Sequence, residues 1–451
     1  MPAAARETEP TLEIHDASVL AWARDTLDRA GDPRAMQQAV LDAVAGNARW
    51  RGEECLNLLA PEAPMSPTVR GLLSAEVGQR AAEGHIGPAN RWFVGTKYID
   101  EIEALCVELL KRAFNARYAD HRLVASMIGN MTVYAALTQP GDAIMSVTQP
   151  FGGHSSNRAD GPAGIRGLRV HDVPMDPIEL VVDLDAFAGA ARQIRPTLVA
   201  LGASMTLFPF PVREMSAIVA EWGGRVFFDG AHQLGLIGGG QFQDPLREGS
   251  CVLTGSAGKT FSGPQSGVIV WNDPALTEPL TDAIFPTLAA THQVNRVAAL
   301  AAAAAEFLAF GPVYMAQIVV NAQALAAALQ ARDVPMLAAH KGFTRTHQAI
   351  ADVRAFGGGE AVAERLAEAN IITNKNLIPT DAPAAWDHPG GLRIGTTEVT
   401  RWGMTEPEMA RIADLMADVL HERRGSAAVR ADAIELRRAF PTLQFCFPPE
   451  A

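Results

Sequence analysis

Apolar residues are spaced in two different ways along this chain, and the change of spacing divides it. Residues 18–29 and 33–45 place apolar side chains roughly every 3.6 positions, which predicts two amphipathic helices. Residues 57–95 are rich in Gly, Pro and Asn, which is typical of loops. Residues 99–114 return to the helical spacing. The chain therefore begins with helices and a loop-rich stretch.

Between about residues 120 and 275, short apolar runs alternate with amphipathic stretches. A glycine or polar residue follows most of these runs, and the alternation is typical of βαβ units in a mainly parallel sheet. The runs are Ala143–Val147, Thr197–Ala203, Arg225–Phe228, Cys251–Leu253 and Val268–Trp271. We predict an α/β fold.

The last part of the chain combines helices and strands. Two helices are predicted, near Gln293–Phe310 and Tyr314–Ala331, followed by a smaller α+β region. Its strands are expected at His347–Val353 and Gly391–Gly395 and its helices at Gly359–Glu368 and Glu406–Arg423. We divide the chain into an N-terminal helical segment (1–56), a large domain (57–310) and a small C-terminal domain (311–451).

The composition and net charge of the chain exclude several classes of partner and site. The net charge is −12 over 451 residues, which argues against nucleic acid and anionic membranes as partners. The four cysteines are widely spaced and form no cluster with histidine, so we predict no metal site. The longest apolar run, Val297–Ala305, is too short to span a bilayer. We expect a cytoplasmic protein.

Polar residues with useful chemistry follow the apolar runs. Ligands of open parallel sheets bind beyond the carboxyl ends of the strands. These ends, including one after a run at Val124–Ala125, present Ser126, His154, Ser204, Asp229, His232, Ser256 and Lys259.

This set suits pyridoxal 5′-phosphate (PLP). A lysine must form a Schiff base with its aldehyde, and a carboxylate must keep the pyridine nitrogen protonated. Hydroxyls and N–H groups at a helix N-terminus must hold the phosphate. Lys259 follows an apolar run among small residues, where an unpaired ammonium would be costly if buried.

Several motifs resemble the serine hydroxymethyltransferase family over about residues 57–425. They are LNLLAPEAPMSP, AAEGHIGPANRWFVGTKYIDEIE, FFDGAHQLGLIGGG, GKTFSGPQSG and GLRIGTTEVTRWGM. GFTRTHQ and FGPVYMAQIVVNA are similar to the related PLP threonine transaldolases. The resemblance implies a fold-type I PLP-dependent transferase with a large mainly parallel-sheet domain and a small C-terminal α+β domain.

The resemblance also implies roles around the cofactor ring. Lys259 is the Schiff-base lysine, and Asp229 pairs with the pyridine nitrogen. His232 lies near the phenolic oxygen, His154 stacks on the ring, and Ser204 lies beside a cofactor oxygen.

Further roles concern the phosphate and the substrate. Ser126, the Met127 backbone and Ser256 would hold the phosphate. Arg393 would bind the substrate α-carboxylate, which suits a bidentate guanidinium. Glu83 matches the family's acid/base carboxylate.

The sequence departs from the family where the one-carbon unit and tetrahydrofolate are handled. Gly258 replaces a histidine before the lysine, and Trp92 and Phe93 replace two tyrosines. A glycine-rich turn becomes Thr287–Gln293, while Asn376 matches a folate-contacting asparagine. The use of tetrahydrofolate is therefore open.

The resemblance implies cleavage or formation of the Cα–Cβ bond of a β-hydroxy amino acid through a quinonoid, with a small aldehyde as the other partner. Hydroxymethyltransferase, aldolase and transaldolase versions stay open. Another fold-type I reaction such as transamination is the alternative, followed by a non-catalytic PLP-binding regulator. A homodimer or a dimer of dimers is expected.

Overall fold

The computed structural model describes residues 15–382 and 384–448. They divide into two compact units between Cys55 and Leu56. The first unit holds α1 (Ala17–Ala30), α2 (Pro33–Arg49) and a π-helical turn at Trp50–Glu54. The Asp16 carboxylate accepts hydrogen bonds from the first N–H groups of α1, and Asp32 does the same for α2. Both helices predicted near the N-terminus are confirmed.

The second unit is built on a seven-stranded sheet with the order β2-β8-β7-β6-β5-β3-β4. Strands β3 to β7 are mutually parallel, and β8 runs antiparallel to both its neighbours. The α/β class and all five apolar runs are confirmed. The strands are β2 (Tyr118–Asp120), β3 (Ala143–Ser146), β4 (Arg169–Asp172), β5 (Leu198–Leu201), β6 (Arg225–Asp229), β7 (Val252–Ser256) and β8 (Gly267–Trp271).

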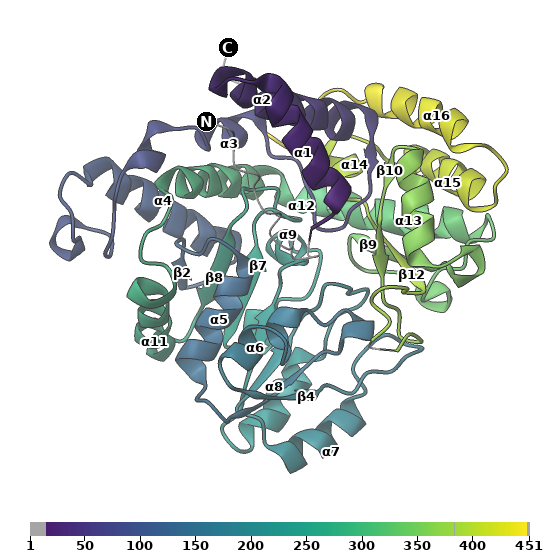
Figure 1. The fold of residues 1–451 in the computed structure, drawn as a ribbon. Coiled ribbons are helices and arrows are strands. Elements are labelled where there is room, and N and C mark those ends of the chain that lie inside the picture. The colour runs from purple at the N-terminus through teal and green to yellow at the C-terminus, as the bar shows by residue number, and fades with distance from the viewer. Residues whose placement is uncertain (1–14, 383, 449–451) are drawn as a thin grey trace, which may run out of the picture. The chain divides into compact units, whose positions relative to one another are not determined.

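Both faces of this sheet are covered (Figure 1). Side chains alternate along each strand, so Val199 and Leu201 join one hydrophobic cluster while Leu198 and Ala200 join another. The helices that precede the small sheet are α3 (Pro67–Leu72), α4 (Lys97–Ala113), α5 (Ser126–Leu137), α6 (Pro162–Ile165), α7 (Leu184–Ile194), α8 (Val212–Ala220), α9 (Leu234–Gly238), α10 (Pro245–Glu248), α11 (Thr277–Asp282) and α12 (Val294–Gln330).

One predicted strand is wrong. The run at Val124–Ala125 is not a strand, because β2 ends at Asp120, whose carboxylate accepts a hydrogen bond from the Arg122 N–H and turns the chain. Ala125 is instead the N-cap residue of α5. Two apolar residues give no periodicity that separates a strand from a helix cap.

The two helices predicted after residue 293 form one helix, α12, which continues through Pro312. Proline removes one hydrogen bond from a helix, but Gly311, Tyr314 and Met315 are buried around it, so packing compensates. By length and hydropathy α12 could cross a membrane, yet 56% of its most apolar window is buried within the protein, as in a core helix. The domain boundary proposed at residue 310 falls inside it.

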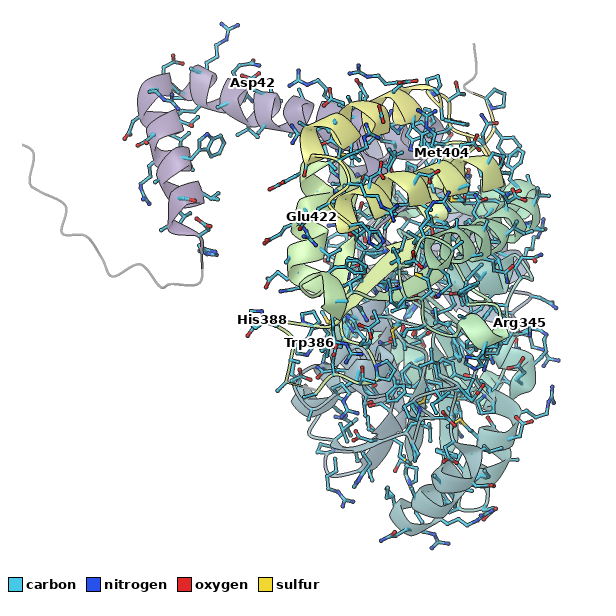
Figure 2. The ribbon with its side chains drawn as sticks, turned by 90° about the vertical axis from the view of Figure 1, so that its right-hand side faces the viewer. Asp42, Arg345, Trp386, His388, Met404 and Glu422 are labelled. Atoms are coloured by element: carbon cyan, nitrogen blue, oxygen red, sulfur yellow. The ribbon has the colours of Figure 1, made fainter. Side chains whose placement is uncertain are left out.

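A small sheet of order β11-β12-β9 follows α12. Its antiparallel strands were predicted in part, whereas α16 was not. Trp386 and His388 lie on the loop between β11 and β12 (Figure 2). The elements are β9 (Gln348–Asp352), α13 (Gly359–Glu368), β11 (Asn374–Asn376), β12 (Gly391–Gly395), α14 (Thr397–Arg401), α15 (Glu406–Leu420) and α16 (Ser426–Arg438), with β1 (Leu56–Asn57) paired to β10 (Ile371–Ile372).

Candidate active site

Lys259 lies in a tight turn that follows β7. The N–H of Ser262 donates to the Lys259 carbonyl oxygen over 2.9 Å, which closes the turn. Burial lowers the pKa of Lys259 to about 8, although the Asp229 charge opposes this shift. The amine therefore becomes neutral, and nucleophilic, at a lower pH than an exposed lysine.

Asp229 ends β6 and faces several donors. Its Oδ2 accepts from Asn130 Nδ2 (2.6 Å) and Asn157 Nδ2 (3.1 Å), and its Oδ1 accepts from the Ala231 N–H (3.1 Å). Asn130 is itself oriented because its Oδ1 accepts from Thr254 Oγ1 over 2.7 Å. These bonds fix the carboxylate in one orientation and leave its charge available to a cationic ring.

His232 is buried beside residues from the small sheet. Its Nδ1 lies 3.2 Å from Gln348 Nε2, and its ring stacks on His347 with centroids 5.7 Å apart. Burial, together with the Lys259 and Arg393 charges, holds the pKa of His232 well below its usual value. Burial also lowers the pKa of His347 to about 3. Both rings are therefore neutral near pH 7.

His154 is oriented by its own loop. Its Nδ1 lies 3.1 Å from the Ser156 N–H nitrogen and 2.8 Å from Ser156 Oγ. Burial lowers the pKa of this ring, and the charges of Asp229, Lys259 and Arg393 all act on it. The loop packs so tightly that a side chain at Gly153 would lie 1.9 Å from the Val147 carbonyl oxygen. A flat ring is thus held at the edge of the sheet.

Arg393 on β12 is a buried cation. Its Nε donates to Asn374 Oδ1 (3.1 Å) and its Nη1 to the Ser204 carbonyl oxygen (2.6 Å). Burial lowers the pKa of Arg393 to about 10, and in the described part of the chain no carboxylate charge opposes this. A desolvated guanidinium held by neutral acceptors is suited to an anionic ligand. The Ser204 N–H donates to the Gly152 carbonyl, which joins this corner to the His154 loop.

The N-terminus of α5 offers a second anion position. Ser126 and Met127 open this helix, and no side chain caps its first N–H groups. Ser256, at the end of β7, is buried. Uncapped N–H groups and hydroxyls are the usual partners of a phosphate.

Glu83 is not joined to this cluster. Its Oε1 accepts from Thr291 Oγ1 over 2.5 Å, and none of the pKa shifts of Lys259, His154 and His232 has Glu83 among its causes. Within one chain, Lys259 interacts electrostatically with Asp229, Arg393, His154 and His232, and the Ser204 carbonyl oxygen bonds Arg393. Ser256 ends β7 three residues before Lys259, whereas Ser126 and Met127 open α5.

Sequence reasoning missed Asn157, His347 and Gln348. Asn157 follows the His154 motif closely, so its position could have been found. His347 and Gln348 come from another part of the chain, and only folding places them against His232.

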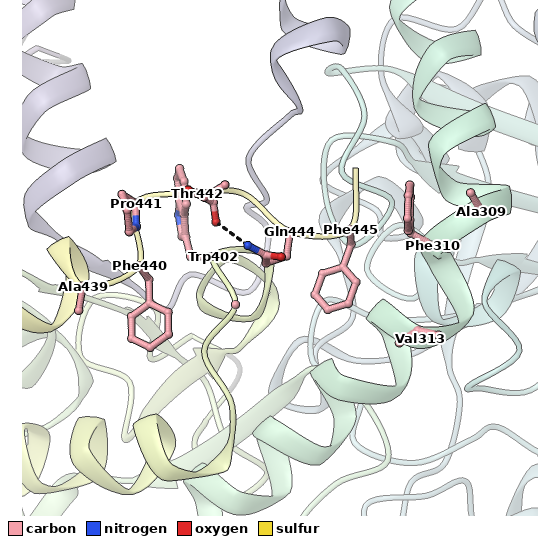
Figure 3. A pocket seen from close by; sticks show the side chains of 11 residues that line it. Ala309, Phe310, Val313, Trp402, Ala439, Phe440, Pro441, Thr442, Gln444 and Phe445 are labelled. Carbon is pink, nitrogen blue, oxygen red and sulfur yellow. Dashed lines mark hydrogen bonds between the residues drawn. The ribbon is translucent and has the colours of Figure 1, made fainter. Parts of the chain in front are cut away.

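The residues present fit PLP. Buried cations at Lys259 and Arg393 lie near an oriented carboxylate and neutral rings, and this arrangement calls for an anionic ligand with a basic ring nitrogen. The site is distinct from a groove of about 740 Å³ between α12 and the C-terminal segment, lined by Phe310, Trp402 and Phe445 among others (Figure 3). That groove contains none of the predicted site residues.

Comparisons with known proteins agree with this reading. A family model described as serine hydroxymethyltransferase matches residues 35–416. The serine hydroxymethyltransferase of Methanopyrus kandleri is 44% identical over 91% of this chain and 95% of its own length. That of Methanocella arvoryzae is 40% identical over 91% and 96%.

A solved structure is also similar. The crystal structure of L-threonine transaldolase from Pseudomonas fluorescens in its internal aldimine state superposes with a TM-score of 0.84 at 25% identity, covering 93% of this chain and 96% of that one. The predicted fold type, enzyme class and cofactor are thereby confirmed. The chain belongs to the serine hydroxymethyltransferase family of PLP-dependent enzymes.

Proposed function

We propose that this enzyme breaks or makes the Cα–Cβ bond of a β-hydroxy amino acid, with a small aldehyde as the other partner, and that it does so without tetrahydrofolate. The observation that carries the proposal is the buried pair of Lys259 and Arg393, together with the Asp229 carboxylate that interacts with Lys259 and is oriented by Asn130.

Each residue has a defined task in this proposal. Bound PLP supplies an electron sink for the pair released at Cα. Lys259 holds the cofactor, Asp229 keeps its ring nitrogen protonated, and His154 covers the ring. Arg393 orients the substrate through its carboxylate. Glu83 moves a proton at the substrate hydroxyl.

The remaining site residues hold the cofactor in place. Ser126, the Met127 backbone and Ser256 would hold the phosphate, and His232 and Ser204 would serve the cofactor's ring oxygen.

Two features support independence from folate. Residues 287–293 are held by their own side chains, since Thr291 bonds Glu83 and His292 bonds Glu103, so this loop does not present a glycine backbone to a ligand. A side chain at Gly258 would begin 2.9 Å from the Gln265 amide, so glutamine takes the space beside Lys259. The names of the archaeal relatives favour the second candidate, folate-dependent serine hydroxymethyl transfer.

Aldehyde release decides between these functions. The purified protein is mixed with L-serine, L-threonine or L-phenylserine, with and without tetrahydrofolate. We expect release of the matching aldehyde at the same rate in both cases, and loss of turnover and of the visible absorbance of bound PLP in Lys259→Ala. Stimulation by folate of more than about tenfold, or about 1.4 kcal/mol, would favour the second candidate. Formation of pyridoxamine phosphate would indicate transamination instead.

A homodimer is part of the proposal. Helices α1 and α2 contain no buried residue, and Trp22, Val40 and Val44 are exposed on them. Trp92 and Val94, near Glu83, are exposed as well. Such apolar surface supports contact with a second copy, which would bring Glu83 to the partner's Lys259 cluster. Sedimentation should give a dimer or a dimer of dimers, and a fully active monomer would contradict this.

A cytoplasmic location completes the proposal. No disulfide joins any of the four cysteines, which suits a reducing compartment.

A further inference from the structure

Glu103 on α4 is a buried carboxylate with three partners. Arg91 Nη2 lies 2.5 Å from its Oε2, His292 Nε2 lies 2.5 Å from its Oε1, and His121 Nε2 lies 3.3 Å from Oε2. Its side chain is 1% exposed. Burial alone would raise the pKa of Glu103, but the adjacent His121 and His292 outweigh this and hold the pKa well below its usual range. The carboxylate is therefore a permanent charge in the interior.

The ligand atoms of Glu103, His121 and His292 lie within 4.8 Å of one another, as they would in a metal site. Arg91, however, already covers Oε2 with a full positive charge, and a dication would have to be buried beside it. The arrangement is therefore a charge-paired hydrogen-bond network.

One arm of this network leads to the backbone of Glu83. Arg91 Nη1 donates to the Ala82 carbonyl oxygen over 2.7 Å, and Arg91 Nε donates to Asp100 Oδ1 over 2.9 Å. The N–H of the next residue, Trp92, donates to the Glu83 carbonyl oxygen over 3.0 Å. Arg91 and the residue that follows it thus fix the main chain at Ala82 and at Glu83.

A second arm leads to the Glu83 side chain. His292 contacts Glu103. Thr291, the residue before it, donates a hydrogen bond from its Oγ1 to Glu83 Oε1 over 2.5 Å. A third contact runs from Arg122, the residue after His121, whose Nη1 lies 3.4 Å from the Gly84 carbonyl oxygen. Three segments that are far apart in the sequence therefore contact both the buried Glu103 carboxylate and the chain around Glu83.

We propose that Glu103 is a positioning residue that sets where the Glu83 carboxylate stands, through Arg91 on the main chain and through His292 and Thr291 on the side chain. The proposal rests on the acid/base role proposed for Glu83. Cutting the side-chain arm lowers kcat, because a misplaced carboxylate serves proton transfer poorly. It leaves KM for the amino acid unchanged, because Arg393 is untouched.

The test uses the PLP-loaded enzyme and variants that spare the buried charge of Glu103. In His292→Gln and Thr291→Val, kcat for aldehyde release should fall by about tenfold to a hundredfold, with KM within about threefold and the visible absorbance of bound PLP retained. Thr291→Ser keeps the hydroxyl and should retain most of the activity. His421→Gln is the matched control, since this partly buried histidine bonds the Arg332 carbonyl in the small domain, and its kcat should not change.

A readout that needs no turnover separates this proposal from the proposed function. Hydrogen exchange of His292→Gln should increase over residues 84–95 and 287–293, and exchange in the strands of the large sheet should not change. If the wild-type enzyme cleaves no β-hydroxy amino acid while this change is seen, the function proposal fails and the network stands. Unchanged kcat in His292→Gln and Thr291→Val, together with unchanged exchange in His292→Gln, would overturn the network. Stoichiometric metal in the purified enzyme that His292→Gln removes would also overturn it.

Discussion

At the scale of single residues, the chemistry depends on charges that the fold has removed from water. Arg393 and Lys259 are both buried, and burial shifts both pKa values downward. An enzyme tolerates such desolvated cations when a ligand of opposite charge completes the site. The role of each of these two residues can be tested separately.

Replacing Arg393 tests the substrate carboxylate. In Arg393→Leu, KM for the amino acid should rise by about tenfold to a hundredfold, because a charge-assisted hydrogen bond of about 1.5–3 kcal/mol is lost. Steady-state kinetics measures this, with Arg192→Leu as the control, since Arg192 forms an exposed surface pair with Glu221. A KM equal to that of the wild type would remove Arg393 from the substrate site.

The pKa of Lys259 predicts how the apoprotein takes up PLP. Because the neutral amine is the nucleophile and the pKa is lowered to about 8, the reconstitution rate should rise with pH up to about 8 and then level. An unperturbed lysine would give a rate that continues to rise to about pH 10.4. Stopped-flow absorbance over this range distinguishes the two profiles.

At the scale of elements, helix glycines show how neighbours decide the effect of a substitution. A Cβ at Gly311 in α12 would lie 2.8 Å from the Phe307 ring, whereas one at Gly189 in α7 would meet nothing within 4 Å. Gly311 also precedes Pro312, a position that disfavours helical backbone for other residues.

The two alanine substitutions should therefore act in opposite directions. Gly189→Ala should raise the free energy of unfolding by about 0.5–1 kcal/mol. Gly311→Ala should lower it by about 1–3 kcal/mol, because the ring has to move. Urea unfolding of both variants checks this, and stabilisation by Gly311→Ala would show that α12 yields more easily than its packing indicates.

The difference between local sequence signals and packing by distant residues explains how much of the structure the sequence could predict. Strands at 225–228 and 251–253 were found because apolar runs bounded by polar residues are a local signal. The continuity of α12 was missed because Pro312 is also a local signal, and the packing that overrides it comes from elsewhere. In the candidate site, Asp229 ends a strand and Lys259 closely follows one, so the local pattern singles both of them out. Gln348 was missed because its contact with His232 joins residues 116 positions apart.

At the scale of the whole molecule, residues 56–451 carry one site made by two sheets. Asp229 ends strand β6 of the seven-stranded sheet and Lys259 and His154 come from its loops, while Arg393 and Gln348 come from β12 and β9 of the small sheet. The two groups meet where Arg393 and Gln348 both donate to the Ser204 carbonyl oxygen. Ser204 is thus the point at which residues of the two sheets are joined by hydrogen bonds.

The unbroken course of α12 has a mechanical consequence. Its first half belongs to the hydrophobic cluster of the large sheet and its last turns, at Leu325 and Leu329, to that of the small sheet. If either core unfolded, the residues of α12 that pack in the other core would lose part of their support. The two cores should therefore unfold together, although chains of this size often unfold in stages. Scanning calorimetry should show a single unfolding peak for residues 56–451. Two resolved peaks would mean that α12 does not couple the two cores and that the helix comes apart near Pro312, where one backbone hydrogen bond is missing.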